Sequence, residues 1–251
     1  WLTAIDVCGG YLSMMIDEKD RDYFGFISHH GLFRWKRVPY GWRNSGANFC
    51  HLMDQVLAGL RWQLLVLYVD DIVVCHGDTF EEHLRALNVV FDRLQTWGLR
   101  LSVAKCQFFL KEFSYLGFSI SREGVSPSPK NVEKLLQICV DSSADVRRFI
   151  GMAQFYRRFI KAFSAICAPL YECMKAAWAN RDVALVEACV AEIKLKLSTH
   201  PVLQHPDFNR RFFLATDGSK LGLGSVLHQK DDSGKLYVVA YASCGLLPSY
   251  K

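Results

Sequence analysis

Apolar residues recur along the chain with two different periods, and each period predicts one type of element. In "NSGANFCHLMDQVLAGL" they recur at helical spacing from Phe49 to Leu60, so one face of this helix would cover a sheet. A second helix is predicted over "DTFEEHLRALNVVFDRLQTWGL", because Asp78 or Thr79 can cap its first turn and Gly98 lies just past its end.

Short runs of β-branched and aliphatic residues, bounded by turn residues, predict strands. The first runs from Leu2 to Asp6 and is followed by a turn through Gly9 and Gly10. The aromatic-rich stretch "YFGFISHHGLFRWKRV" predicts a hairpin that turns near residues 29–31, and residues 64–75 predict a tighter hairpin. The other strands expected in this half of the chain lie at residues 12–16, 101–103, 107–110 and 115–120.

Two stretches that contain proline mark boundaries along the chain. After "GVSPSPKNVEKL" the sequence predicts successive helices until about residue 200, and after "HPVLQHPDF" it predicts new strands in "RRFFLATDG", "GLGSVLHQK" and "KLYVVAYAS". The expected fold class is therefore α+β: an antiparallel sheet packed on helices, then a helical region, then the first strands of a second sheet. The predicted domains are residues 1–122, 123–205 and 206–251.

Composition narrows the class of protein only slightly. With 251 residues, of which 51% are hydrophobic, the chain can bury a large core in one domain or two. A net charge of +5 and a pI near 8.7 suit a polyanionic partner, although a slightly basic, solvated surface is the commoner explanation. The nine cysteines include no CxxC pair, which indicates reduced thiols in an intracellular protein and neither a zinc site nor a disulfide framework.

Neither the opening residues nor the most apolar run indicates a secretory or membrane protein. The opening "WLTAIDVCGG" has no apolar leader and no initiator methionine, so we expect the chain to begin within a fold and to lack a signal peptide. Residues 64–75 are too short to span a bilayer, which needs about 20 apolar residues, and they carry two charges. No membrane partner is expected.

Those two charges, Asp70 and Asp71, interrupt the apolar run "LLVLYVDDIVVC". They have two interpretations. Aspartates in a hairpin turn commonly bond their own backbone. Alternatively, carboxylates in a hairpin buried on one face repel each other and lose hydration unless a cation such as Mg²⁺ compensates them. Asp6 ends another apolar run before a glycine turn. We therefore predict that Asp6, Asp70 and Asp71 meet at one metal site.

Five ordered motifs carry a resemblance to a known family. The stretches "AIDVCGGY", "RVPYGWRNSGANFCHLMDQVL", "LLVLYVDDIVV", "LRLSVAKCQFF" and "FSYLGFSIS" resemble the palm motifs of reverse transcriptases from gypsy-class long-terminal-repeat retrotransposons and their retroviral relatives. "VRRFIGMAQFYRRFIKAFSAICAPL" is similar to the thumb of that class, and "HPDFNRRFFLATDGSKLGLGSVLHQ" to the start of its ribonuclease H domain. The resemblance implies a palm over 1–122, a helical thumb or connection over 123–205, and a truncated ribonuclease H-like domain over 206–251.

The resemblance also implies a reaction. It makes the chain part of an RNA-directed DNA polymerase within a Pol polyprotein, in which two Mg²⁺ ions, or Mn²⁺ as an alternative, assist nucleotidyl transfer to a primer 3′-hydroxyl. Asp6 and Asp70 match the main metal-binding carboxylates, and Asp71 the third. The implied partners are an RNA or DNA template with its primer, dNTPs and other Pol segments. The implied location is intracellular, in cytoplasmic virus-like particles and in the nucleus.

Further residues match positions that contact nucleotide or primer in this family. Tyr11 matches the bulky residue beneath the incoming sugar, where a ring would exclude a 2′-hydroxyl. The nucleotide-binding matches are Val7, Gly9, Gly10, Tyr11, Tyr40, Gly41 and Lys105, and the primer-contacting matches are Tyr68, Val69, Leu116 and Gly117. Without the resemblance, Tyr11 would be interpreted as an ordinary core tyrosine. Tyr40 and Leu116 could also be core residues, and Lys105 would be a solvated surface lysine. A basic stripe of the thumb would comprise Arg147, Arg148, Arg157, Arg158 and Lys161.

The chain also departs from the family pattern. Ser45 and Gly46 stand where an Ala-Pro pair is usual, and Cys50 replaces a common glutamine, so a looser helix start is expected. Asp217 matches the first ribonuclease H carboxylate, but the fingers and the remaining ribonuclease H acids are not in the sequence. An alternative is therefore a catalytically silent nucleic-acid-binding fragment of a decayed element or an incomplete gene. For the chain alone we expect weak primer-template binding, little polymerisation and no RNA cleavage.

Overall fold

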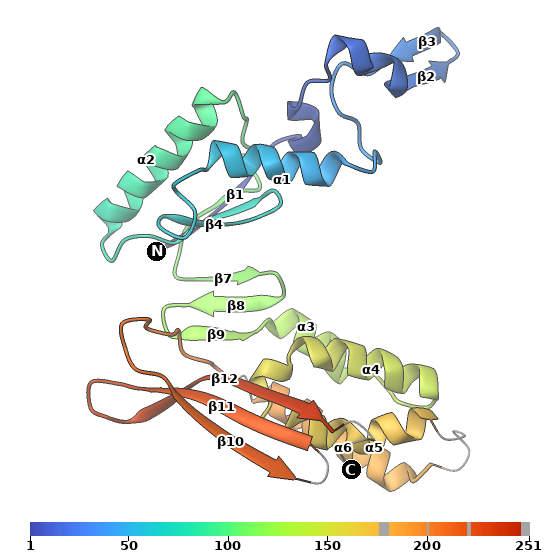
Figure 1. Cartoon of the computed structure of the whole chain (residues 1–251), viewed down its shortest axis with the longest axis vertical. Coiled ribbons are helices and arrows are strands. Elements are labelled where there is room, and N and C mark those ends of the chain that lie inside the picture. The colour runs from blue at the N-terminus through green and yellow to red at the C-terminus, as the bar shows by residue number, and fades with distance from the viewer. Residues whose placement is uncertain (176–180, 200, 220–221, 247–251) are drawn as a thin grey trace. The chain divides into compact units, whose positions relative to one another are not determined.

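The chain folds into two units, Trp1–Lys111 and Glu112–Lys251 (Figure 1). The computed structural model describes residues 1–175, 181–199, 201–219 and 222–246. Helices and antiparallel sheets occur in both units, so the expected α+β class is confirmed. Within these described ranges, no helix is long and apolar enough to cross a membrane. All nine cysteines are free thiols, as the sequence predicted.

Unit 1 is built on a four-stranded antiparallel sheet with the order β4-β5-β1-β6. Ile5 of β1 pairs with Ile72 of β5, and both are buried against helices α1 and α2. Because side chains alternate between the two faces of a strand, the next pair, Asp6 and Asp71, faces away from the helices. The elements are β1 (Leu2–Asp6), α1 (Ser45–Val56), β4 (Leu65–Tyr68), β5 (Asp71–Val74), α2 (Phe80–Thr96) and β6 (Gln107–Leu110).

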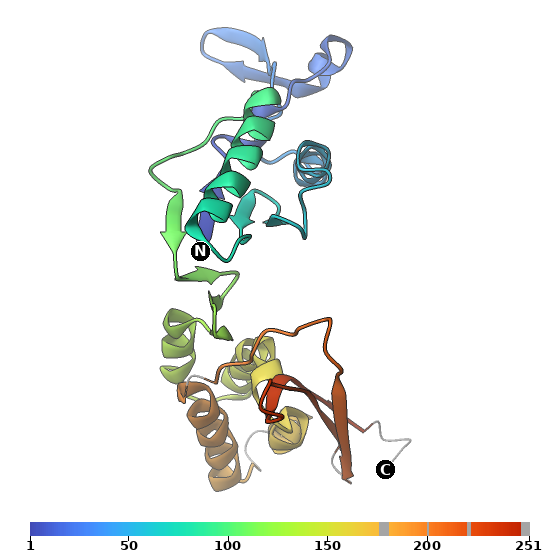
Figure 2. The ribbon, with the colours of Figure 1, turned by 90° about the vertical axis from the view of Figure 1, so that its left-hand side faces the viewer.

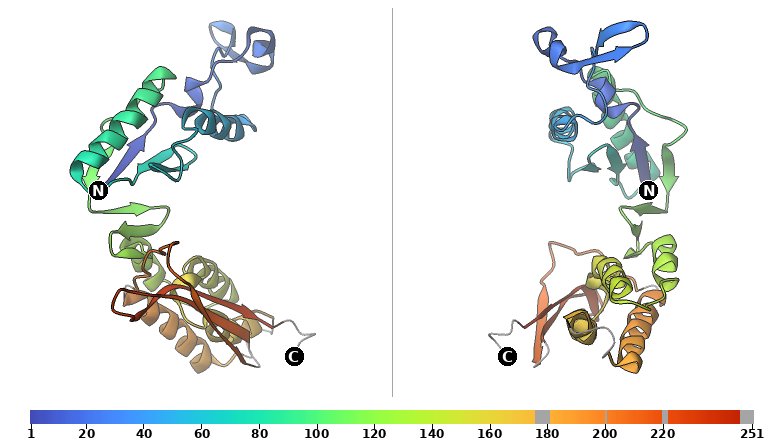
Figure 3. Two further views of the ribbon diagram at one scale, coloured as in Figure 1. Left: turned by 60° about the vertical axis from the view of Figure 1, so that its left-hand side comes forward. Right: turned by 90° about the vertical axis from the view of Figure 1, so that its right-hand side faces the viewer.

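The helix and strand predictions for unit 1 are largely confirmed. α2 begins with the expected capping box, in which the Thr79 side chain accepts from the Glu82 amide and the Glu82 carboxylate accepts from the Thr79 amide. The aromatic hairpin also forms, as β2 (Gly25–Ser28) and β3 (Gly31–Arg34), and it projects away from the four-stranded sheet of the unit (Figure 3).

Two strand predictions in unit 1 are wrong. Residues 12–16 do not form a strand, because Gly9 adopts a left-handed conformation with φ 65° and turns the chain into the short 3₁₀ helix η1 (Gly10–Ser13). A second 3₁₀ helix, η2 (Glu18–Phe24), follows. Residues 101–103 contribute only a bridge from Leu101 to Val7, because the amides of Lys105 and Cys106 turn back to the Ser102 carbonyl.

Unit 2 contains two three-stranded antiparallel sheets, β7-β8-β9 and β10-β11-β12, and a layer of helices. The helices bury a common apolar core and lie on one side of the β10–β12 sheet (Figures 2 and 3). The elements are β7 (Glu112–Tyr115), β8 (Phe118–Ser121), β9 (Gly124–Pro127), α3 (Pro129–Leu136), α4 (Ser143–Phe155), η3 (Arg157–Phe159), α5 (Phe163–Lys175), α6 (Val183–Ser198), β10 (Phe213–Ser219), β11 (Gly222–Lys230) and β12 (Leu236–Gly245).

The prediction of a single strand over residues 115–120 is wrong. Leu116 and Gly117 both have positive φ and form a turn, so the segment is the β7–β8 hairpin. The hairpin and β9 pack within unit 2, whereas the palm was expected to extend to residue 122. The domain boundaries at residues 122 and 205 stay predictions. The three final strands and the helices before them are confirmed.

Candidate active site

The turn between β4 and β5 presents the two adjacent aspartates to solvent. Tyr68 pairs with Asp71, which leaves Val69 and Asp70 as the two turn residues. The apolar flanks enter the core, where Leu65, Ile72 and Val74 have no exposed surface, while Asp70 and Asp71 are exposed. The turn extends beyond the core, so both carboxylates reach solvent, and the expected loss of hydration is partial and falls on Asp71.

Strain is present in the same turn. Val69 has φ 58°, a left-handed conformation that is a genuine outlier for a β-branched residue. Such strain persists only where the surrounding structure holds it, and it is common at functional sites. Here the buried residues of the flanking strands, Leu65 of β4 and Ile72, Val73 and Val74 of β5, anchor the turn to the core.

The negative charges of the three predicted metal ligands affect one another. Asp6 and Asp71 are register partners on neighbouring strands. Partial loss of hydration, with the negative charges of Asp70 and Asp6, raises the pKa of the Asp71 carboxyl above its usual range. Within the described part of the chain, however, no three His, Cys, Asp or Glu side chains form a group that could hold a metal ion.

The chemistry of these side chains nevertheless fits Mg²⁺, which prefers oxygen ligands and typically takes one or two carboxylates together with substrate phosphates. The pKa of the Asp71 carboxyl is raised by partial loss of hydration and then by repulsion from Asp70 and Asp6, and a divalent cation relieves that repulsion. These carboxylates therefore suit a metal ion whose remaining ligands are supplied by the substrate. The joint metal site of Asp6, Asp70 and Asp71 stays a prediction.

Lys105 lies beside Asp6. The Lys105 Nζ is 3.7 Å from the Asp6 Oδ2, and the lysine side chain is 71% exposed against 29% for the aspartate. The Ser102 amide donates to the Asp6 carbonyl, and the Asp6 amide donates to the Cys106 Sγ at 3.4 Å. Lys105 is therefore both solvated and next to the carboxylate. The role of Cys106 gave no signal in the sequence, because it depends on a contact between residues 100 positions apart.

Two of the predicted nucleotide-binding residues, Tyr11 and Tyr40, form an aromatic cluster with Phe49. The Tyr11 ring lies 5.5 Å from the Tyr40 ring and 5.7 Å from the Phe49 ring, centroid to centroid. Tyr40 is 66% exposed, so the cluster reaches the surface. A Cβ on Gly10 would lie 3.4 Å from the Phe49 ring, so the backbone approaches α1 closely at this point. Gly9 and Gly41 both have positive φ and shape the two loops.

The backbone before this cluster is already partly paired. Val7 is buried and forms a bridge with Leu101, and the Cys8 amide donates to the Arg100 carbonyl at 2.7 Å. Of the segment expected to offer amides to a triphosphate, the Cys8 amide is therefore engaged within the protein.

The departures from the family pattern are accommodated at the start of α1. Ser45 is buried, its hydroxyl donates to the Pro39 carbonyl at 3.2 Å, and its amide donates to the Trp42 carbonyl at 3.1 Å. These bonds tie the helix to the loop that carries Tyr40, although the N-cap residue Asn44 makes no side-chain cap bond, and the looser start stays a prediction. A Cβ on Gly46 would lie 3.6 Å from the Tyr11 hydroxyl.

The primer-contacting predictions are divided between the two units. Tyr68, 55% exposed, and Val69 belong to the β4–β5 hairpin of unit 1. Leu116 and Gly117 form the β7–β8 turn of unit 2. The basic residues expected along one helical region are all exposed: Arg147 and Arg148 lie on α4, Arg157 and Arg158 lie on the adjoining η3, and Lys161 follows η3.

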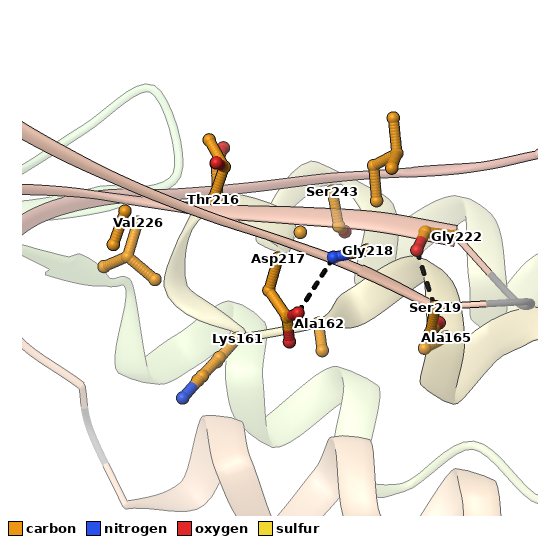
Figure 4. A pocket seen from close by; sticks show the side chains of 14 residues that line it. Lys161, Ala162, Ala165, Thr216, Asp217, Gly218, Ser219, Gly222, Val226 and Ser243 are labelled. Atoms are coloured by element: carbon orange, nitrogen blue, oxygen red, sulfur yellow. Dashed lines mark hydrogen bonds between the residues drawn. The ribbon is translucent and has the colours of Figure 1, made fainter.

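Asp217 lies on β10 beside a cavity of about 200 Å³ within unit 2 (Figure 4). Its Oδ1 accepts from the Gly218 amide at 2.9 Å. Lys161, Thr216 and Ser243 also line the cavity, and among its described lining residues Asp217 is the sole acid. One carboxylate alone does not hold a pair of metal ions.

Comparison with known proteins agrees with this arrangement. Residues 1–120 match the family described as "Reverse transcriptase (RNA-dependent DNA polymerase)". Residues 186–251 match the "RNase H-like domain found in reverse transcriptase", a match that starts within α6.

Curated relatives are polyproteins of transposons. The chain is 32% identical over 232 residues to the retrovirus-related Pol polyprotein from transposon 297 of Drosophila melanogaster, covering 91% of this chain and 22% of the relative. It is 29% identical over 242 residues to the transposon Tf2-3 polyprotein of Schizosaccharomyces pombe, covering 96% and 18%. The chain thus spans about a fifth of the length of these relatives.

Solved structures share the fold. The foamy viral protease-reverse transcriptase in complex with RNA/DNA hybrid matches 98% of this chain, and 33% of its own, with 25% identity and a TM-score of 0.79. A form of the same viral protein in complex with double-stranded DNA matches 99% of this chain, and 43% of its own, with 25% identity and a TM-score of 0.85. The resemblance predicted from the motifs is confirmed: the chain carries a reverse transcriptase domain over residues 1–120 and an RNase H-like domain found in reverse transcriptases over residues 186–251.

Proposed function

We propose that this chain is the segment of a retrotransposon Pol polyprotein that carries the polymerase active site, and that the whole protein is an RNA-directed DNA polymerase. The observation that carries the proposal is the pairing of Asp6 with Asp71 on the face of the sheet opposite the helices, next to Asp70 in a solvent-exposed turn. This arrangement leaves the carboxylates accessible to substrate phosphates.

Asp6, Asp70 and Asp71 would hold two Mg²⁺ ions, or Mn²⁺ as an alternative. When bound, the ions would lower the pKa of the primer 3′-hydroxyl and neutralise the pyrophosphate leaving group. The protein residues supply position and charge. Lys105, which is exposed and adjacent to Asp6, would move its ammonium from that carboxylate to the triphosphate.

The Tyr11–Tyr40 cluster would bind the nucleotide sugar. Tyr11 is braced by Phe49 of α1, so its ring has a fixed position against which a 2′-hydroxyl would clash. In an active polymerase that contains this chain, Tyr11→Ala is expected to admit ribonucleotides. Primer extension with dNTPs and rNTPs would measure the change, and an unchanged sugar preference would make Tyr11 an ordinary packing residue.

The proposed partners are an RNA or DNA template with its primer, dNTPs and the other Pol segments. The structurally similar foamy viral protease-reverse transcriptase was solved with an RNA/DNA hybrid and, in another form, with double-stranded DNA, which supports nucleic acid as a partner. We place the protein inside the cell, in cytoplasmic virus-like particles and in the nucleus, and the nine free thiols suit such a reducing compartment.

A second candidate function is nucleic-acid binding without catalysis. It is favoured by the lack of a metal-sized group of three ligands among the described residues and by the single carboxylate at the Asp217 cavity. This candidate predicts that the aspartates contribute nothing to metal binding.

The two candidates are separated by measuring Mn²⁺ binding and primer extension together. The purified chain is titrated with Mn²⁺ by electron paramagnetic resonance, with and without a DNA primer on an RNA template and a dNTP. We expect the primer-template and dNTP to strengthen Mn²⁺ binding, and Asp70→Asn to abolish that gain. Mn²⁺-independent hybrid binding that is the same in Asp70→Asn would support the silent fragment. Extension that disappears in Asp70→Asn would establish polymerisation directly, and RNA cleavage that depends on Asp217 would contradict the expectation for the ribonuclease H-like domain.

A further inference from the structure

The β7–β8 hairpin turns at two residues that both adopt left-handed backbone conformations. Leu116 has φ 49° and Gly117 has φ 84°, between the paired residues Tyr115 and Phe118. Two-residue turns of this kind favour Asn-Gly or Gly-Gly, so a leucine in the first position is strained. Leu116 is also 41% exposed, so burial of its side chain does not fully offset that strain.

The turn is held by two donors that meet on one carbonyl. The Gly117 carbonyl accepts from the Ser128 amide at 3.0 Å and from the Tyr156 hydroxyl at 2.9 Å. Tyr156 lies directly after α4 and is 3% exposed. The side chain of Asn131, on α3, hydrogen-bonds the same tyrosine hydroxyl.

Packing closes the turn from the other side. The rings of Phe118 and Phe155 stack with centroids 4.9 Å apart. A Cβ added to Gly117 would meet the Phe155 ring at 3.1 Å and the Asn131 amide nitrogen at 3.2 Å, so the glycine is required both by its backbone conformation and by its neighbours.

We propose that Tyr156 is a positioning residue that keeps the Leu116–Gly117 turn in its strained conformation, so that Leu116 is presented to the nucleic acid. The inference rests on the proposed function, because it takes the primer strand as the ligand of this turn. The hydroxyl of Tyr156 bonds the turn while its ring packs in the core of unit 2 against Phe118 and Phe159, which links the turn to the helical layer.

The surroundings of the turn suit a nucleic-acid strand. Phe155 is 52% exposed beside Gly117 and offers a ring face on which a base or sugar can pack. Arg157 and Arg158 follow Tyr156 directly and are exposed, which places cations for phosphate contact next in the chain.

The first test concerns the free protein. Tyr156→Phe keeps the ring and removes the donor, so hydrogen exchange at the Ser128 amide, which bonds the same carbonyl, is expected to quicken while the amides of α4 stay protected. Tyr171→Phe is the matched control, because Tyr171 packs against the same core from α5. Unchanged exchange at Ser128 in Tyr156→Phe would overturn the proposal.

The second test is a double-mutant cycle on binding of a DNA primer annealed to an RNA template. Leu116→Ala and Tyr156→Phe are each expected to weaken binding about 5-fold, and Asn131→Ala by less. If Tyr156 acts through the turn, the double variant Tyr156→Phe with Leu116→Ala also weakens binding about 5-fold, whereas independent roles would give about 25-fold.

The outcomes distinguish this inference from the function on which it rests. Failure of the unaltered chain to bind the hybrid would refute the proposed function. Binding by the unaltered chain with additive losses in the cycle, or with no loss in Tyr156→Phe, would refute the positioning role and leave the function standing. Asn131→Ala provides a second variant should Tyr156→Phe fail to fold, and its coupling to Leu116→Ala is then the deciding measurement.

Discussion

The turns of the β4–β5 and β7–β8 hairpins use the same strained conformation but stabilise it in different ways. Each places a bulky apolar residue in the left-handed region at its first turn position: Val69 with φ 58° and Leu116 with φ 49°. Beside Val69 the strain is held by flanking strands whose residues Leu65, Ile72 and Val74 are buried against the helices. Beside Leu116 the strain is held by hydrogen bonds to the Gly117 carbonyl.

This difference follows from what each turn carries. The β4–β5 hairpin presents two charges that are exposed to solvent at its turn, so its anchors lie in the strands behind the turn. The β7–β8 turn presents an apolar side chain, and polar anchors can reach its backbone directly. The comparison shows that a strained turn needs neighbours that hold it, but that these can be apolar or polar according to what the turn exposes.

The largest expected effect is on the charges of the first turn. Asp70→Asn in an active polymerase that contains this chain should slow primer extension by on the order of a hundred- to a thousand-fold, because a ligand of the reacting metal ions is lost. Asp54→Asn is the control, since Asp54 lies on α1 and pairs with Arg61. Its extension rate should change by less than about two-fold. Equal rates in both variants would remove the catalytic role from the turn.

The next largest effect is expected from a substitution that disrupts the β7–β8 turn. Gly117→Ala should destabilise unit 2 by about 1–3 kcal/mol, because alanine is strained at φ 84° and its Cβ would press on Phe155 and Asn131. Gly151→Ala is the control within α4, where a Cβ meets nothing within 4 Å and φ is not positive. That change should stabilise the helix by about 0.5–1 kcal/mol. Hydrogen exchange of α4 amides measures both, and a neutral Gly117→Ala would show that the turn tolerates rearrangement.

A smaller effect is specific to the sheet behind the first turn. His83 is buried, its Nδ1 donates to the His76 carbonyl at 3.0 Å, and its Nε2 accepts from the Thr3 hydroxyl at 2.8 Å. Burial lowers the pKa of His83 below its usual value near 6.5. Above that pH both the folded and unfolded states are neutral at this residue, so it has no effect there. Below it the unfolded state binds the proton more readily, and stability falls until the folded pKa is reached.

For this one group, the free energy of unfolding should change by no more than about 1.4 kcal/mol per pH unit. Urea unfolding at pH 7.5, 6.5 and 5.5, followed by tryptophan fluorescence, would measure it. His83→Gln should flatten the slope, whereas His30→Gln, on the exposed hairpin tip, should leave it unchanged. The same slope in both variants would assign the acid sensitivity to other groups.

The smallest effect is expected when the backbone strain at Val69 and at Leu116 is relieved in turn, so that the two can be compared. Val69→Gly and Leu116→Gly each remove a left-handed bulky residue, and each should stabilise its own hairpin by up to about 1 kcal/mol after the added flexibility of glycine is subtracted. Hydrogen exchange of β5 and β8 amides reports the two hairpins separately. Val103→Gly is the control, because Val103 is exposed and has no positive φ, and it should not stabilise the protein. A gain in only one hairpin would show that the two strains differ.

Local sequence alone predicted several elements correctly. Strand Leu2–Asp6, the helix capped by Thr79 and the three final strands were found from periodicity and turn residues, since these signals lie within a few positions of one another. The family and its candidate carboxylates were likewise identified from ordered motifs.

Other features depended on conformation that the local pattern does not contain. Residues 12–16 are rich in apolar side chains, as in a strand, but after the left-handed Gly9 the chain enters the 3₁₀ helix Gly10–Ser13 instead. Residues 115–120 carry an apolar pattern, yet Leu116 and Gly117 reverse the chain. A bulky residue with positive φ is unfavourable by local rules, so only the contacts of the folded unit make it tolerable.

The chemistry of the site divides in the same way. The sequence determined which residues carry charge, which strands are apolar and which family the motifs belong to. The tertiary structure decided that Asp70 and Asp71 stay in water, that Lys105 lies 3.7 Å from Asp6, and that Tyr156 bonds a carbonyl 39 positions earlier. Such contacts arise from strand register and helix packing, which join residues distant in the chain, and no local period encodes which of them will meet.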